Sequence, residues 1–339
     1  MLEITPRGMY CPQADVYIDP WKPVPRALIT HAHSDHARWG MDHYLSHKDT
    51  LPVLRQRLGD AISVQGVAYG ETLSRNGVQI SFHPAGHVPG SAQIRLAYRG
   101  EVWVVSGDYK MEDDGLSTPF EAVRCHTFIT ESTFGLPVYR WQPQALIMEE
   151  IRDWWRQNIE QGKASLLAAY ALGKAQRILA NLGPDLPGPV YIHGAIASVN
   201  EVLQRSGYAL PQVTQLRADL PKKEMRRALV LAPPQATDTP WTRKLGPLSL
   251  GVASGWMSLR GARRRRAADR GFALSDHADW EGLNAAVTAS GAQRVLVTHG
   301  YTDVFARHLR EKGLDAEPLE TLFEGDEGEQ GSGNSYQGT

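Results

Sequence analysis

The sequence contains only two cysteines, Cys11 and Cys125, which lie far apart and form no Cys-x-x-Cys pattern. This excludes both a disulfide framework and a cysteine-based zinc site, and it favours a reducing compartment such as the cytoplasm. The formal net charge is only -1. Because no overall charge draws the protein to nucleic acid or to an anionic membrane, any contact with a polyanion depends on a local basic patch.

Long hydrophobic runs are also lacking. No segment approaches the length that spans a bilayer, and the first residues, MLEITP, do not form a basic region followed by an apolar stretch. We therefore expect a cytoplasmic protein that is neither exported nor embedded in a membrane. With 339 residues, of which 42% are hydrophobic, the chain can bury a sizeable core, and we expect two domains or one domain with a large insertion.

Residues that bind metals are concentrated in one short segment, which contains His31, His33, Asp35 and His36. The segment follows the apolar residues 27–29, which predict a strand running into a loop. Imidazole and carboxylate groups suit zinc. Because His31 and His33 can face one ion while Asp35 and His36 point elsewhere, the spacing predicts two neighbouring ions. The alternative is a polar loop that is rich in histidine by chance.

Three further candidate ligands each come directly after a probable strand: His87, Asp108 and His299. Loops that leave the same edge of a sheet converge, and a strand end can hold a ligand within the small tolerance that a metal requires. Taken singly, each residue has a structural alternative, such as a hydrogen-bonded loop histidine or an aspartate in a turn. Taken together, they favour a metal site built from several loops.

The pattern of hydrophobic residues changes along the chain. Up to about residue 131 it predicts short strands separated by turns, with strands at 15–18, 27–30, 78–82 and 92–98. From Gln144 it predicts an amphipathic helix closed by Gly162, and then alternating strands and helices in the βαβ manner. Strands at 271–274 and 294–297 flank a further helix. The fold class is therefore α/β.

Two sets of motifs resemble known families. The order His-x-His-x-Asp-His, then His87 and Asp108, is similar to the metallo-β-lactamase superfamily. The segments ESTFG at 131–135, SDH at 275–277 and VTHG at 297–300, with the α/β stretch between them, resemble the β-CASP nucleases of that superfamily. The length and the segments 131–137 and 274–280 are most similar to the bacterial DNA-ligase-associated exonucleases, some of which are labelled mRNA 3′-end processing factors.

This resemblance implies a fold and a domain arrangement. The fold is a metallo-β-lactamase αββα sandwich with an inserted α/β β-CASP domain. The first part of the sandwich is expected at 1–143, the insertion at 144–266 and the second part at 267–323. Residues 324–339 are rich in Gly, Glu, Gln and Ser with almost no apolar anchor, so we expect a disordered tail.

The resemblance also implies the role of each site residue. One zinc ion is bound by His31, His33 and His87, the other by Asp35, His36 and His299, and Asp108 bridges them; manganese is possible in place of zinc. Asp19 hydrogen-bonds the metal loop without binding metal, Glu131 orients His277, and His277 protonates the leaving oxygen. The structural alternatives are a turn residue for Asp19, a strand-end cap for Glu131 and a buried structural histidine for His277.

Contacts to nucleic acid are expected in two places. Arg260, Arg263 and Arg264 belong to a basic run that can meet backbone phosphates, although a solvated surface run is an equal alternative. Tyr170 and Lys174 enter a helix after a strand, and they resemble the matching β-CASP loop. Free backbone N–H groups, a lysine and an aromatic ring in such a loop can hold a terminal phosphate or nucleotide.

The activity that the resemblance implies is hydrolysis of phosphodiesters to a 5′-phosphate and a free 3′-hydroxyl. We expect a DNA exonuclease linked to DNA repair that acts on single-stranded DNA, with a DNA ligase and a helicase as partners. An RNA-processing nuclease of the ribonuclease J or 3′-end-processing type is the alternative, because eukaryotic family members with histidine at the position of His299 act on RNA. A small-molecule metallo-hydrolase and a non-catalytic scaffold are less favoured.

Overall fold

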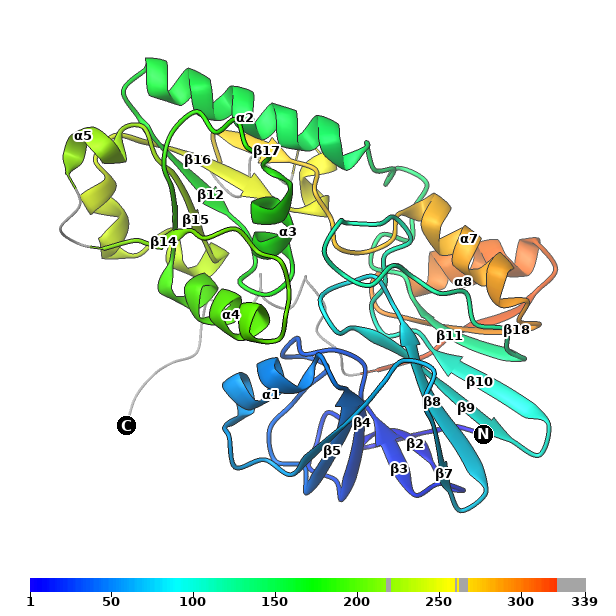
Figure 1. The fold of residues 1–339 in the computed structure, drawn as a ribbon. Helices are drawn as coiled ribbons and strands as arrows, with labels where there is room; N and C mark the ends of the chain where they lie inside the picture. Colours follow the sequence, from blue (N-terminus) through cyan, green and yellow to red (C-terminus); the bar gives the residue numbers. More distant parts are fainter. Residues whose placement is uncertain (218–220, 260, 262–267, 322–339) are drawn as a thin grey trace, which may run out of the picture. The chain divides into compact units, whose positions relative to one another are not determined.

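The computed structural model describes residues 1–217, 221–259, 261 and 268–321, and Figure 1 draws them as a ribbon. The chain divides into two units. The first consists of Met1–Asp113, Ser117–Val138 and the described residues from His277 onward, and the second of Asp114–Leu116 and Tyr139–Asp276. The predicted insertion, 144–266, falls within the range of the second unit. The predicted tail, 324–339, lies outside the described residues.

The first unit contains two sheets. The smaller has its strands in sequence order: β1 (Glu3–Thr5), β2 (Gly8–Cys11), β3 (Val16–Ile18), β4 (Arg26–Ile29), β5 (His43–His47) and β6 (Val64–Val67). The pairs from β1 to β3 are antiparallel, and those from β3 to β6 are parallel. Helix α1 (Leu51–Leu58) connects β5 to β6 and packs against β6.

The larger sheet of this unit has the order β19-β18-β11-β10-β9-β8-β7. Its strands are β7 (Thr72–Arg75), β8 (Val78–Pro84), β9 (Ala92–Tyr98), β10 (Glu101–Val105), β11 (Thr127–Glu131), β18 (Arg294–Thr298) and β19 (Asp315–Pro318). A tight turn at Asn76-Gly77 joins the antiparallel strands β7 and β8, and one at Arg99-Gly100 joins the antiparallel strands β9 and β10. All four of these turn residues have positive φ. Such turns match the twist of the strands that they connect.

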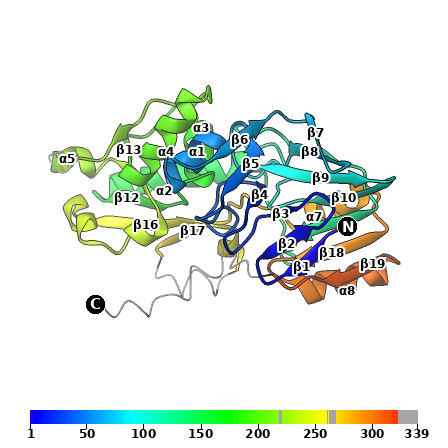
Figure 2. The ribbon, with the colours of Figure 1, turned by 90° about the horizontal axis from the view of Figure 1, so that it is seen from below.

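Apolar side chains fill the space between the two sheets. Ile18 and Leu28 from the smaller sheet meet Ile80 and Ile94 from the larger one in a single buried cluster. Strands β11 and β18 are apolar on both faces, so their other side packs against α7 (Trp280–Ser290) and α8 (Thr302–Glu311). Figure 2 shows both helices beside β18. This sandwich confirms the predicted α/β fold class.

The second unit is built on a parallel sheet with the order β14-β13-β15-β12-β16-β17. Its strands are β12 (Ala164–Ala168), β13 (Val190–Ile192), β14 (Thr214–Gln215), β15 (Leu229–Ala232), β16 (Leu248–Ala253) and β17 (Arg270–Phe272). Its helices include α2 (Gln144–Glu160), α3 (Lys174–Asn181), α4 (Gly194–Arg205) and α5 (Lys222–Met225), with short 3-10 helices at Pro234–Ala236, Pro240–Leu245 and Gly255–Ser258.

Side chains alternate between the two faces of this sheet. Leu167 and Leu231 point to the face that α2, α3 and α4 cover, whereas Leu166 and Val230 pack against α5 and the second 3-10 helix.

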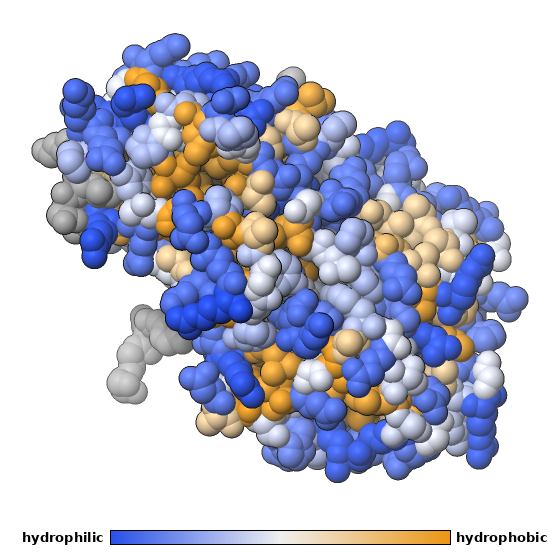
Figure 3. Space-filling model, viewed as in Figure 1, coloured by the Kyte–Doolittle hydropathy of each residue, from blue (hydrophilic) through white to orange (hydrophobic). Residues whose placement is uncertain are grey.

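Figure 3 shows exposed hydrophobic residues as separate patches on a mostly hydrophilic surface. Among the described residues, no helix is both long enough and apolar enough to cross a bilayer.

Candidate metal centre

Four loops of the first unit carry the predicted ligands. His31, His33, Asp35 and His36 follow β4, and one ligand follows each of β8 (His87), β10 (Asp108) and β18 (His299). The loops approach one another closely. Gly107 has a φ of +56°, and a Cβ atom there would lie 2.7 Å from Cβ of Thr30, the residue before His31. Glycine therefore lets the Asp108 loop pack directly on the His31 loop.

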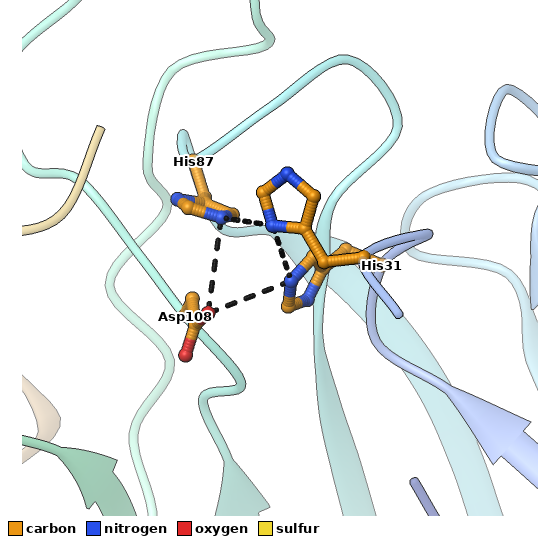
Figure 4. A group of neighbouring side chains, drawn as sticks. His31, His87 and Asp108 are labelled. Carbon is orange, nitrogen blue, oxygen red and sulfur yellow. Dashed lines mark hydrogen bonds and ion pairs between the residues drawn. The ribbon is translucent and has the colours of Figure 1, made fainter. Parts of the chain in front are cut away.

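The first group of ligands consists of His31, His33, His87 and Asp108, whose donor atoms all lie within 4.8 Å of one another. Nδ1 of His33 is 3.1 Å from Nε2 of His31 and 3.1 Å from Nε2 of His87. Oδ2 of Asp108 is 3.5 Å from Nε2 of His31 and 3.8 Å from Nε2 of His87. Figure 4 shows the side chains of His31, His87 and Asp108 pointing toward a common centre.

A second group contains Asp35, His36 and His299, again within 4.8 Å. The rings of His36 and His299 stack with centroids 5.1 Å apart, and Nε2 of His36 lies 3.5 Å from Oδ2 of Asp35. The same nitrogen is 3.4 Å from Oδ2 of Asp108. Because Asp108 also contacts the first group, its carboxylate lies between the two.

These residues fit a pair of divalent cations. Oδ1 of Asp108 is buried and has no hydrogen-bond partner within the part of the chain that the structure describes. A buried carboxylate oxygen without a partner is costly unless an ion or a water satisfies it. The donor set of imidazole nitrogens and carboxylate oxygens suits zinc and also manganese.

The carboxylate of Asp19 lies behind the loop that carries His31 to His36 and contacts two of its neighbouring residues. Its Oδ2 lies 2.8 Å from Nδ1 of His36 and accepts a hydrogen bond from the Thr30 hydroxyl, while its Oδ1 accepts one from the Thr30 N–H at 2.8 Å. Asp19 is 1% exposed. A carboxylate that binds Nδ1 of an imidazole fixes the ring and presents Nε2 for coordination.

The electrostatics of the two groups differ. Burial lowers the pKa of His31 well below its ordinary value, and the neighbouring His36 lowers it further. The neutral imidazole that results is the form that binds metal. Burial also lowers the pKa of His36, but the carboxylates of Asp108 and Asp35 outweigh it and raise this pKa well above the ordinary value. The carboxylates of Asp108 and Asp35 therefore favour positive charge at His36.

His277 and Glu131 form a separate pair beside the first group. Nδ1 of His277 is 2.9 Å from Oε2 and 3.1 Å from Oε1 of Glu131. The Glu131 carboxylate also accepts hydrogen bonds from the Tyr109 N–H at 2.8 Å and from the Thr133 hydroxyl at 2.5 Å. The rings of His277 and His87 are 4.6 Å apart. The Glu131 carboxylate thus fixes an imidazole next to the candidate metal ligands.

The residues predicted to contact nucleic acid do not belong to the two ligand groups. Lys174, in the second unit, is 2% exposed; its Nζ lies 3.3 Å from Oδ2 of Asp276 and 4.8 Å from the centre of the Tyr170 ring. Asp276 also pairs with Arg177 at 3.2 Å. The Lys174 charge is thus directed at a buried carboxylate, and phosphate binding by Lys174 and Tyr170 stays a prediction. Arg260, Arg263 and Arg264 lie outside the described residues.

Several supporting residues escaped the sequence analysis. Thr30 and Thr133 bind the carboxylates of Asp19 and Glu131, and Arg57 donates a hydrogen bond to the Ala32 carbonyl oxygen at 2.5 Å. The two threonines lie next to motif residues, which is a weak signal. Arg57 comes from α1, and nothing in the sequence connects it to the loop that it contacts.

Comparison with known proteins gives several relatives. A protein of Opitutus terrae named "Probable DNA ligase" is 33% identical over 313 residues, which is 91% of this chain and 30% of that protein. "Ribonuclease TTHA0252" of Thermus thermophilus is 28% identical over 52% of this chain and 48% of its own. "RNase aCSPSF2" of Saccharolobus solfataricus is 26% identical over 40% of this chain and 28% of its own. This chain is related to the β-CASP nucleases of the metallo-β-lactamase superfamily.

The β-CASP relationship has two further aspects. No family model matches the chain, and the chain spans less than half the length of each of the relatives named above. A solved structure from Enterococcus faecalis V583, described as a protein of unknown function, aligns with a TM-score of 0.55 over 87% of this chain and 79% of that chain at 11% identity. That similarity supports the shared fold.

Proposed function

We propose that this chain is a metal-dependent nuclease that hydrolyses phosphodiester bonds of nucleic acid. One observation carries the proposal: Oδ2 of Asp108 lies 3.5 Å from Nε2 of His31 and 3.4 Å from Nε2 of His36, so one carboxylate is shared by both ligand groups. A shared carboxylate between two nitrogen-rich groups suits the two-metal sites of phosphodiester hydrolases.

Each ligand has a place in this proposal. His31, His33 and His87 would hold one divalent ion and Asp35, His36 and His299 the other, with the carboxylate of Asp108 available to both. Ions in these positions supply positive charge to screen the phosphodiester and lower the pKa of water. Zinc is the proposed metal, with manganese as the alternative, because both accept nitrogen and oxygen ligands. Asp19 keeps Nε2 of His36 directed at the site.

His277 is the proposed general acid. Its Nδ1 is hydrogen-bonded to Glu131, which leaves Nε2 as the nitrogen that carries a proton to the departing oxygen. The Glu131 carboxylate stabilises the protonated ring and holds its orientation, a role that other buried carboxylates play for catalytic histidines. The products are then a 5′-phosphate and a free 3′-hydroxyl.

Single-stranded DNA is the proposed substrate, with exonucleolytic cleavage linked to DNA repair. The alignment of 91% of this chain with part of a protein named as a probable DNA ligase supports this, and it supports a DNA ligase as a functional partner. A repair helicase as a second partner rests on the family resemblance alone. RNA processing is the alternative function, favoured by the relatives named as ribonucleases and by histidine at position 299.

The experiment that tests this proposal compares DNA and RNA of the same single-stranded sequence, labelled at either end, with the purified chain and Zn²⁺ or Mn²⁺. We expect the DNA to shorten progressively from one end to products with 5′-phosphates. Cleavage of RNA alone would replace the proposed function by its alternative. Hydrolysis of a thioester or lactone without cleavage of either oligonucleotide would overturn it.

A variant tests the role of His277. His277→Ala should lower cleavage of DNA by roughly 100-fold or more, the range that a general acid contributes. It should lower hydrolysis of bis(p-nitrophenyl) phosphate much less, because nitrophenolate departs without a proton. His43→Ala, an exposed histidine that contacts Ser63, is the matched control. Equal losses on both substrates would exclude proton donation by His277.

A further inference from the structure

An unusually exposed tryptophan lies in the loop that carries the metal-binding residues. Trp39 is 74% exposed and comes three residues after His36. The other large hydrophobic residues recorded as exposed in the described chain are aliphatic and range from 43% to 55%. Leaving an indole in water forfeits a large hydrophobic stabilisation. The exposed indole of Trp39 is therefore available to stack on a ligand.

The indole of Trp39 has a fixed attachment. Its Nε1 donates a hydrogen bond of 3.2 Å to the carbonyl oxygen of Leu58, at the end of α1. This bond anchors the edge of the ring while its faces stay open to solvent. A ring held in this way loses little conformational entropy when a planar group stacks on it.

A positive charge lies at the same junction between the loop and α1. Nη1 of Arg57 donates hydrogen bonds to the carbonyl oxygens of Ala32 and Ala37, at 2.5 and 3.5 Å. The Arg57 side chain is exposed, and its Nε and Nη2 make no hydrogen bond within the described part of the chain. Helix α1 carries Arg55 as well and has no acidic residue, although Asp49 and Asp60 flank it.

We propose that Trp39 and Arg57 form a subsite for single-stranded nucleic acid, in which Trp39 stacks on an unpaired base and Arg57 binds an adjacent phosphate. This inference rests on the proposed nuclease function. Three residues of chain span at most about 11 Å, so Trp39 lies within reach of the nucleotides beside a phosphate held at His36. An open aromatic face beside a guanidinium suits bases and phosphates together.

The subsite discriminates between single strands and duplexes. In a duplex the faces of the bases are already stacked on one another, so the Trp39 ring can reach a base only where the strand is unpaired or frayed. An exposed base needs no such unstacking, and stacking on an aromatic side chain strengthens its binding by roughly 5- to 100-fold. Trp39 thus favours single-stranded substrates.

The test measures KM for a single-stranded oligonucleotide and for bis(p-nitrophenyl) phosphate, which lacks a stacked neighbouring base. Trp39→Ala should raise KM for the oligonucleotide by roughly 5- to 100-fold more than KM for the small diester. Trp39→Phe keeps an aromatic face but loses the bond to Leu58, so it should retain most of the affinity. Arg57→Gln should weaken binding and flatten its salt dependence, whereas Arg307→Gln, at an exposed arginine of α8, should not.

The outcomes separate this inference from the function on which it rests. If the wild-type chain cleaves no oligonucleotide, the proposed nuclease function fails. If it cleaves and Trp39→Ala has the wild-type KM, only the subsite is overturned. If Trp39→Ala and Trp39→Phe raise KM for the oligonucleotide equally, Trp39 acts through its hydrogen bond to Leu58, and stacking is overturned. An equal rise in KM for single-stranded and blunt duplex substrates in Trp39→Ala would also overturn stacking. Thermal unfolding of each variant verifies that it is folded.

Discussion

Each unit buries a carboxylate among nitrogen-bearing side chains, but the two carboxylates have different surroundings. Asp276 in the second unit is paired with two permanent cations, Lys174 and Arg177. Asp108 in the first unit lies among histidines, and its Oδ1 finds no hydrogen-bond partner among the described residues. A carboxylate that fixed cations already neutralise serves the fold, whereas one that lacks such partners can take up an ion.

Removing the shared carboxylate should have the largest effect. Asp108→Asn keeps the size of the side chain but loses the negative charge that both ligand groups contact. We expect nuclease activity to fall on the order of 1,000-fold and the amount of bound metal, measured by elemental analysis, to fall with it. Asp113→Asn, at an exposed residue of the adjacent segment, is the control. Full metal content in Asp108→Asn would contradict the bridging role.

Breaking the buried ion pair between Lys174 and Asp276 in the second unit should lower the stability of the protein. Lys174→Met removes one of the cations that pair with the buried Asp276, so the free energy of unfolding should fall by about 3 kcal/mol, the lower end for a broken buried ion pair. Denaturant titration measures this, with the exposed Lys244→Met as control. Unchanged stability together with weaker oligonucleotide binding would instead support the predicted role of Lys174 as a phosphate ligand.

The carboxylate of Asp19, which contacts His36, should also affect the affinity for metal. Asp19→Asn exchanges the carboxylate behind His36 for an amide, which holds the imidazole less firmly and no longer supplies negative charge. We expect the affinity for metal to fall by about 10- to 100-fold, measured by titration of the metal-free protein with a competing chelator. The exposed Asp42→Asn should leave this affinity unchanged, and the same affinity for both variants would contradict the orienting role.

A buried histidine outside both clusters gives the smallest expected effect. Nδ1 of His47 accepts a hydrogen bond from the Asp49 N–H at 3.3 Å, which only unprotonated Nδ1 can do. Burial lowers the pKa of His47 to about 4, although Asp49 partly opposes this. The unfolded chain takes up this proton at about pH 6.5, so the stabilisation is complete above that pH and is lost as pH falls toward 4.

His47→Gln isolates this contribution. Between pH 7.5 and 5.5 the wild-type free energy of unfolding should fall by about 1 kcal/mol more than that of the variant. Denaturant titrations in the presence of a chelator measure the difference without a contribution from bound metal. Parallel pH profiles for the two proteins would show that His47 has an ordinary pKa in the folded state.

Much of the secondary structure followed from the sequence. The strands expected at 78–82 and 92–98 correspond to β8 and β9, and the helix expected from Gln144 corresponds to α2. These segments have clear hydrophobic periodicity or well-defined turns. Helix α1 and strands β5 and β19 were not predicted, because α1 has only 8 residues, while β5 and β19 read HYLSH and DAEP without regular alternation.

The sequence predicted which residues belong to the candidate site better than it predicted the hydrogen bonds that hold them. The closely spaced residues from His31 to His36 predict a metal-binding loop because so many residues that can bind a metal occur together, and the structure groups their donor atoms. The motifs around His87, Asp108 and His299 added candidate ligands through their similarity to a family. The hydrogen bonds of Thr30, Thr133 and Arg57 could not be foreseen, since such residues are common throughout the chain and only proximity gives them a partner.

The sequence by itself determined the kind of chemistry: which side chains can bind a cation, and where strands end in loops that carry them. Tertiary structure alone decided which charges are already neutralised. Lys174 has the same charge as Arg57, yet the fold directs the first at the buried Asp276 and leaves the second exposed beside the metal loop. Burial and distance set the strength of an electrostatic interaction, and both arise only when distant segments of the chain pack together.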